Sequence, residues 1–165
     1  MRATRLVALV VLCVGSSSAS FAAGGGGGGA DTAASAFQTK PSDPNYVRAK
    51  AMIEARDYRG ALPLLQQVVA KDPRNADAYN LMGYAVRSSG DPNGSLQYYQ
   101  QALALDPRHL GAHEYIGEAY LMLNRPAEAE QHLARLDSLC IFGCSEYRML
   151  KAAITSYKAG KRPTN

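Results

Sequence analysis

The chain has few of the side chains that metal and redox sites require, with three cysteines, three histidines and no tryptophan among 165 residues. It also has no G-x-S-x-G, H-E-x-x-H or phosphate-loop motif, which mark serine hydrolases, zinc proteases and nucleotide-binding proteins. No other group of residues amounts to a catalytic set. We therefore predict a protein that is not an enzyme and that needs no cofactor or metal.

The chain also has no apolar run of the roughly 20 residues that a bilayer-spanning helix needs. The run near the N-terminus covers only Leu6 to Val14, between a short basic start and a series of small residues. This order is typical of a secretory signal peptide. We predict cleavage after Ala22, so that residues 1–22 are the signal and no membrane span is left. The predicted location is the bacterial periplasm or the outside of the cell.

Excess charge of one sign is scarce as well. The sequence has 18 basic and 14 acidic residues, and loss of Arg2 and Arg5 with the signal leaves 16 against 14. The resulting net charge of 16 − 14 = +2 is spread evenly along the chain. It is too small to predict binding of nucleic acid.

Glycine is concentrated in one place. Six consecutive glycines, Gly24 to Gly29, open a segment of small and polar residues. Such a composition buries too little apolar surface to offset the entropy of ordering, so residues 23–40 are predicted to be a flexible linker. No G-K-[ST] follows the glycines, which argues against a phosphate-binding loop. The predicted folded domain covers residues 41–160, and residues 161–165 form a tail.

The folded part repeats itself every 34 residues. The segments "AKDPRNADAY" (Ala70–Tyr79) and "ALDPRHLGAH" (Ala104–His113) align at this offset. Small residues coincide at positions 49, 83 and 117, and apolar or aromatic residues coincide at positions 65, 99 and 133. Apolar side chains within each copy recur at helical spacing, and no run looks like a strand. The pattern predicts an all-α fold.

These spaced small and large positions resemble the tetratricopeptide repeat, a helix–turn–helix unit of about 34 residues. The resemblance implies a right-handed α-solenoid of three repeats, at about residues 42–75, 76–109 and 110–143. An amphipathic segment at about 145–159 is predicted to be one further helix that caps the stack.

Stop and start signals separate the predicted helices. Gly90 and Asn124 follow the first helix of copies two and three, where a residue in the left-handed conformation commonly ends a helix. Asp91 is then expected to cap the next helix. Pro63 lies inside the second helix of copy one, which we expect to begin late, near residue 59 or 60, or to bend.

Two glycines lie inside predicted helices. Gly83 and Gly117 each cost about 1 kcal/mol relative to alanine at an interior helical position. We expect them to allow close approach of the second helix of the pair, with the small residues Ser95 or Ala102 meeting the gap.

Cys140 and Cys144 stand at the turn that closes copy three, on either side of Gly143. In an oxidising compartment two thiols so close together favour a disulfide, which we predict to hold the last turn. Neither the C-x-x-C redox motif nor the C-x-x-C-H haem motif is present. A thiol-redox or metal-handling role of this pair, with His132 as the nearest histidine, is the alternative function.

The other histidines give no complete metal site. His109 and His113 are four residues apart near a predicted helix start, so both can face one ion. Two ligands are half a site, and no acidic or cysteine partner has a suitable spacing. We predict solvated or capping side chains.

In tetratricopeptide repeats the first helix of each pair lines a concave groove. Carried over position by position, the resemblance implies the groove residues Tyr46, Lys50, Ile53, Asp77, Asn80, Tyr84, Arg87, Glu114, Glu118 and Leu121. Their mixture of aromatic, amide and charged groups suits an extended peptide or a partner helix. The lysine–asparagine clamp with which some family members hold a C-terminal carboxylate is not supported, because Tyr46, Lys50 and Leu81 stand in or near its positions.

The predicted function is therefore protein–protein interaction, as an adaptor or assembly factor in the periplasm whose partner binds in the groove. This inference rests on family analogy, because a fold alone does not fix a function. Self-association through the exposed end of the stack is a third possibility.

Overall fold

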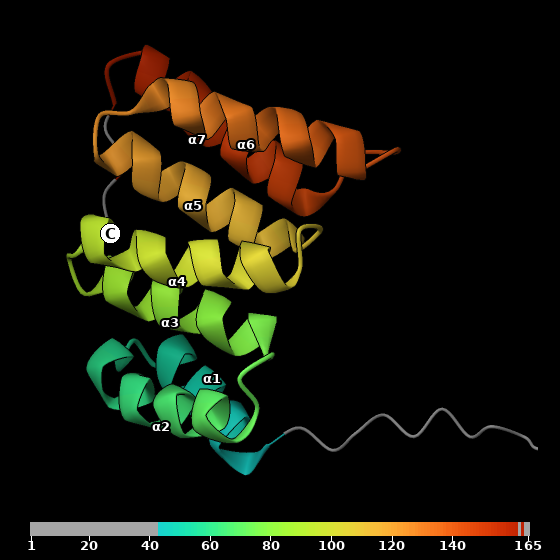
Figure 1. Ribbon diagram of the computed structural model, residues 1–165. Helices are drawn as coiled ribbons and strands as arrows, with labels where there is room; N and C mark the ends of the chain where they lie inside the picture. The colour runs from blue at the N-terminus through green and yellow to red at the C-terminus, as the bar shows by residue number, and fades with distance from the viewer. Residues whose placement is uncertain (1–42, 162, 164–165) are drawn as a thin grey trace, which may run out of the picture. The chain divides into compact units, whose positions relative to one another are not determined.

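The computed structural model describes residues 43–161 and residue 163, so the predicted signal peptide and linker lie outside the described residues. Figure 1 shows helices following one another through a stack in chain order. The described chain contains seven α-helices and no strand, which confirms the all-α fold class. The helices are α1 (Pro44–Glu54), α2 (Tyr58–Lys71), α3 (Ala76–Ser88), α4 (Pro92–Leu105), α5 (Leu110–Met122), α6 (Pro126–Leu139) and α7 (Ser145–Lys158).

The helices pack as three hairpins and a closing helix. Each of the ranges 42–75, 76–109 and 110–143 contains two helices, and α7 lies within 145–159. Every helix contacts its neighbours along the chain, and the first helices of the pairs also contact one another: α1 with α3, and α3 with α5. α7 contacts α5 in the same way. This arrangement is an α-solenoid, with the first helices gathered on one face. None of the described helices has the combination of length and apolar character needed to cross a bilayer.

The turn inside each hairpin has the same backbone geometry. Arg56, Gly90 and Asn124, each 34 residues from the next, have φ angles of +62°, +98° and +60°. The backbone N–H of the following residue donates to the carbonyl five positions earlier, at 2.8, 3.2 and 2.8 Å. These bonds close the last turn of each first helix. The prediction for Gly90 and Asn124 is confirmed, and Arg56 takes the same role without the expected residue type.

The second helix of the first hairpin begins in register with the others. The Asp57 carboxylate accepts a hydrogen bond from the Gly60 N–H at 2.9 Å, as the Asp91 carboxylate does from Gly94 in the second hairpin. This cap fixes the start of α2 at Tyr58, so the predicted late start was wrong. Pro63 lies inside the helix.

The two mid-helix glycines are notches for large side chains. A Cβ atom on Gly83 would lie 2.6 Å from the Tyr99 ring, which belongs to the second helix of the same hairpin. A Cβ atom on Gly117 would lie 2.6 Å from Leu150 of α7. The predicted close approach of the second helix of the pair is present at Gly83, where a ring fills the gap in place of the expected small residues. At Gly117 the prediction was wrong, because α7 and not α6 supplies the side chain that fills the gap.

The buried apolar side chains form two clusters. The N-terminal cluster is built from α1, α2 and α3, around Ala49, Ala61, Leu65, Val68, Ala78 and Met82. The C-terminal cluster joins α4, α5, α6 and α7, around Leu96, Tyr99, Ile116, Ala119, Tyr120, Leu121, Ala129, Leu136, Leu150 and Ile154. α7 therefore contributes to the core and is not merely a surface helix.

Candidate partner-binding groove

A pocket of about 330 Å³ opens between the first helices of the three hairpins. α1 supplies one aliphatic and two charged side chains, α3 supplies one aliphatic side chain and one ring, and α5 supplies one ring. The turn after α1 and the first residue of α2 close one side. The pocket is lined by Lys50, Ile53, Glu54, Arg56, Tyr58, Leu81, Tyr84 and Tyr115. We call it the tyrosine pocket.

Three tyrosine rings form the centre of this pocket. The ring centroids of Tyr58 and Tyr84 are 6.1 Å apart in an edge-on arrangement, and those of Tyr84 and Tyr115 are 5.0 Å apart. Edge-to-face and tilted contacts are the favoured geometries of aromatic pairs. Burial raises the pKa of the Tyr115 hydroxyl to about 12, so this group stays neutral and can donate or accept a hydrogen bond.

Arg87 supports the tyrosines from within the fold. Its Nη1 atom lies 2.9 Å from Oε2 of Glu118, and its Nε donates to the Tyr99 hydroxyl at 3.4 Å. The guanidinium carbon lies 5.4 Å from the centroid of the Tyr84 ring and 5.7 Å from that of the Tyr115 ring. Because only 7% of Arg87 is exposed, the residue acts as a support for the rings and not as a surface charge.

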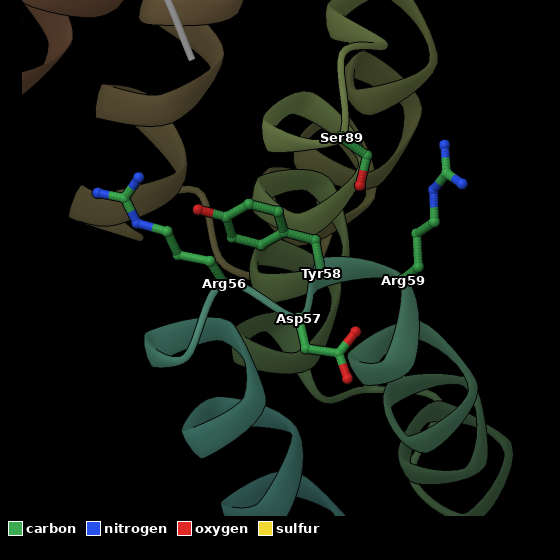
Figure 2. A pocket seen from close by; sticks show the side chains of 5 residues that line it. All are labelled: Arg56, Asp57, Tyr58, Arg59 and Ser89. Atoms are coloured by element: carbon green, nitrogen blue, oxygen red, sulfur yellow. The ribbon is translucent and has the colours of Figure 1, made fainter.

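A second, smaller hollow of about 240 Å³ adjoins the turn between α1 and α2. It is lined by Arg56, Asp57, Tyr58, Arg59 and Ser89. Figure 2 shows the guanidinium groups of Arg56 and Arg59 extending on either side of the Tyr58 ring. Arg56 and Tyr58 line both hollows, so this turn is a common wall with a basic edge.

Two of the buried polar side chains on the first helices stand at equivalent positions of successive repeats. Asn80 is 7% exposed, and within the described chain its Oδ1 has no hydrogen-bond partner. Glu114, the equivalent residue one repeat later, is 3% exposed. Its burial, together with the nearby carboxylates of Glu118 and Glu146, raises the pKa of Glu114 to about 8, although Arg87 opposes the shift.

The ten predicted groove residues fall into distinct environments. Lys50, Ile53 and Tyr84 line the tyrosine pocket, and Arg87 and Glu118 form the ion pair that supports it. The remaining five comprise the buried Asn80 and Glu114, the half-buried Tyr46 in the N-terminal cluster, the exposed Asp77 and the fully buried Leu121. Leu121 has no exposed surface, so it cannot contact a partner and is not a groove residue.

Sequence reasoning missed five of the pocket residues: Glu54, Arg56, Tyr58, Leu81 and Tyr115. Leu81 and Tyr115 are equivalent positions 34 residues apart, so the repeat itself held a signal for this pair. Tyr58 begins a second helix, and the rule that first helices line the groove excluded it. Arg56 was missed because nothing marks an arginine as a turn residue.

The three histidines take structural positions. Nδ1 of His109 accepts from the Ala112 N–H at 3.1 Å, so its Nε2 donates to Asp77 at 3.1 Å and ties two repeats together. The Nδ1 atoms of His113 and His132 lie 2.8 Å apart. The described residues contain no group of three or more histidine, cysteine or acidic side chains placed to hold a metal ion.

Cys140 and Cys144 form the predicted disulfide, with their Cα atoms 5.5 Å apart. The bond closes the turn between α6 and α7. Between the two cysteines, Ile141 is 86% exposed and Phe142 is 98% exposed.

Two family models, both described as a tetratricopeptide repeat, match residues 46–92 and 86–154. No curated protein matches the sequence. Among solved structures, MamA from Desulfovibrio magneticus RS-1 is 27% identical, with a TM-score of 0.55 over 58% of this chain and 54% of that one. This chain thus spans little more than half of that MamA chain.

The secretion translocator chaperone SycD of Yersinia enterocolitica gives a TM-score of 0.61 at 18% identity, over 70% of this chain and 87% of that one. At this identity the likeness is one of fold.

Proposed function

Because the chain belongs to the tetratricopeptide-repeat family, we propose that it is a protein–protein interaction module whose partner binds in the tyrosine pocket and along the first helices around it. Stacked repeats of this kind create extended concave surfaces for binding. The observation that supports this site is the set of three tyrosines, drawn from three hairpins, on one hollow surface.

The chemistry of the pocket favours a peptide or helix that inserts one apolar or aromatic side chain. Tyrosine and arginine are over-represented at binding hot spots because they offer large contact areas with a polar end. Arg87 holds two of the rings through contacts that exist before a partner arrives. A preorganised pocket lowers the entropy cost of binding.

Crosslinking and pull-down of the protein from cells test this function. A Lys50→Ala, Tyr84→Ala double variant removes one charged and one aromatic wall of the pocket, and we expect it to lose the partner. A matched Gln66→Ala, Gln100→Ala variant alters exposed side chains of α2 and α4 and should retain the partner. Arg87 is left unchanged because its loss would disturb the core.

Equal capture by both variants, with circular dichroism showing that both are folded, would reject the groove as the binding surface. Loss of the partner by the pocket variant alone supports it. The partner's identity then follows from mass spectrometry of the captured protein.

We also propose that the protein works outside the cytoplasm, as an adaptor or assembly factor. The basic and apolar N-terminal segment and the Cys140–Cys144 pair support export to an oxidising compartment. N-terminal sequencing of the protein from a periplasmic extract should find a chain that begins at Ala23. An intact Met1 in the cytoplasmic fraction would reject export.

A further inference from the structure

The turn between α6 and α7 displays the two most exposed large apolar side chains of the described chain. Phe142 is 98% exposed and Ile141 is 86% exposed, whereas the next, Val47, is 55% exposed. Isolated apolar residues are common on the surfaces of soluble proteins. Two adjacent bulky ones on a single turn, with almost no contact to their own fold, are typical of a contact surface.

This turn is held in one shape. The Cys140–Cys144 disulfide closes a loop of five residues, and the Gly143 N–H donates to the Cys140 carbonyl at 3.1 Å. Nη1 of Arg148 donates to the Gly143 carbonyl at 3.4 Å. Folding gains nothing from exposing Phe142, but a rigid display of that ring reduces the entropy that binding must overcome.

The same chain carries a pocket suited to such a side chain. The tyrosine pocket has a volume of about 330 Å³, aliphatic walls from Ile53 and Leu81, and the rings of Tyr58, Tyr84 and Tyr115. A phenylalanine ring meets tyrosine rings favourably in edge-to-face geometry. Phe142 does not occupy the pocket of its own chain, because the side chain is almost fully exposed.

Charge near the two features is of both signs. Lys50 and Arg56 are exposed at the pocket, with Glu54 as the one acid among its lining residues. The segments that flank the exposed turn carry two acids and two bases, Asp137, Glu146, Arg135 and Arg148. The apolar side chains of the turn and the rings of the pocket are therefore what would hold the two surfaces together.

We infer that the Ile141–Phe142 turn of one copy binds in the tyrosine pocket of a second copy. This self-contact rests on the proposed function, since it uses the same groove and competes with the partner for it. The two surfaces differ, so the contact is head-to-tail and each added copy leaves one free turn and one free pocket. The contact is small, so we expect weak, concentration-dependent association.

Sedimentation velocity of the purified full chain under oxidising conditions tests the inference. The weight-average mass should rise with concentration up to the millimolar range. Phe142→Ser should remain monomeric, and Tyr84→Ala should do the same from the opposite side. Val47→Ser, which removes an exposed apolar side chain elsewhere, should associate like the original protein.

Mixing the two monomeric variants gives the most specific result. Phe142→Ser still has a pocket and Tyr84→Ala still has a turn, so one contact can form and the mixture should stop at dimers. Association of Phe142→Ser alone, or a mixture that stays monomeric, would overturn the inference. If Tyr84→Ala fails to fold by circular dichroism, Ile53→Ser replaces it, because Ile53 is a half-buried wall outside the tyrosine contacts.

Two further readouts distinguish this self-contact from lipid binding by the turn and from partner binding in the groove. If Phe142→Ser loses binding to vesicles of phosphatidylethanolamine and phosphatidylglycerol while self-association is unchanged, the turn binds lipid and the inference fails. Partner capture is scored separately. Phe142→Ser should capture the partner at least as well as the original protein, whereas failure of the proposed function would appear as capture by Tyr84→Ala.

Discussion

The Nδ1 atoms of His113 and His132 lie 2.8 Å apart between α5 and α6, and Nε2 of His113 lies 3.2 Å from the Pro107 carbonyl. A carbonyl only accepts, so Nε2 of His113 carries a proton, and in the neutral ring Nδ1 then accepts from His132. The His132 ring is stacked on Tyr120 at 5.7 Å. The two imidazoles cannot both be protonated in this arrangement, and the lowered pKa values of His113 and His132 favour the state in which both are neutral.

The histidine pair predicts a loss of stability in acid. Burial lowers the pKa of His132 to about 4 and also lowers that of His113. Between about pH 6.5 and 4 the unfolded chain binds more protons than the folded one, so the free energy of unfolding falls as pH falls. The His132 contribution is on the order of 2 kcal/mol. Urea unfolding of His132→Gln, which keeps a donor but does not titrate, should show a shallower dependence in this window. An identical slope would contradict the pairing.

Glu114 predicts the opposite dependence at higher pH. Its pKa in the folded protein is raised to about 8 by burial and by Glu118 and Glu146, so the folded state holds a proton that the unfolded state releases near pH 4.5. The free energy of unfolding therefore falls as pH rises from about 4.5 to 8, by on the order of a few kcal/mol. Glu114→Gln, which mimics the protonated acid, should remove this slope. If the urea midpoint changes between pH 5 and pH 8 by the same amount in both proteins, Glu114 does not hold this proton in the folded state.

The turn after α1 can be stabilised. Arg56 has a φ of +62°, where a residue with a Cβ atom is strained by roughly 1–2 kcal/mol. Arg56→Gly should raise the free energy of unfolding by about 1 kcal/mol. Gly90→Ala is the reverse change at the equivalent turn, where a Cβ meets no neighbouring atom, so only the backbone conformation is tested. It should destabilise the protein by a similar amount. A thermal midpoint that is unchanged in both variants would contradict the shared turn geometry.

Removal of the disulfide is expected to loosen the last helix but to leave the repeats folded. The double variant Cys140→Ser, Cys144→Ser should lower the free energy of unfolding by roughly 2 kcal/mol. The bond reduces the entropy of the unfolded chain, and the effect is modest because the loop that it closes is short. Leu150 and Ile154 remain buried, so α7 stays docked with faster amide exchange. Circular dichroism melts and hydrogen exchange under oxidising conditions measure both effects. Thiol titration of the exported, denatured protein should find no free thiol, whereas readily reversible oxidation or stoichiometric zinc or copper would favour the alternative function.

The periodic part of the structure could be predicted from the sequence, and the local contacts between side chains could not. The 34-residue repeat located the hairpins, and two turns were marked by residue types that tolerate positive φ, Gly90 because it has no Cβ atom and Asn124 because asparagine adopts this conformation readily. Arg56 gave no such signal, because its conformation is imposed by the hairpin that it joins. The expected late start of α2 failed because Asp57 caps the helix at the usual place.

The candidate site was only partly predictable for a similar reason. First-helix positions identified Lys50, Ile53 and Tyr84, because they follow from the repeat alone. The burial of Arg87 depends on Glu118, which belongs to the next repeat. His113 and His132 meet across two helices with no counterpart in the other copies. Contacts of this kind depend on how helices are placed against each other, which a periodic pattern does not specify.

Gly83 and Gly117 occupy the same position in successive repeats, yet a tyrosine of the same hairpin fills the first notch and Leu150 of α7 fills the second. The repeats are alike in sequence but are not interchangeable parts. A copy of repeat two placed at the end of the stack would bring its own ring to the notch and displace α7. The identity of the last repeat is thus coupled to the last helix, so a longer version of this protein would have to keep repeat three next to α7.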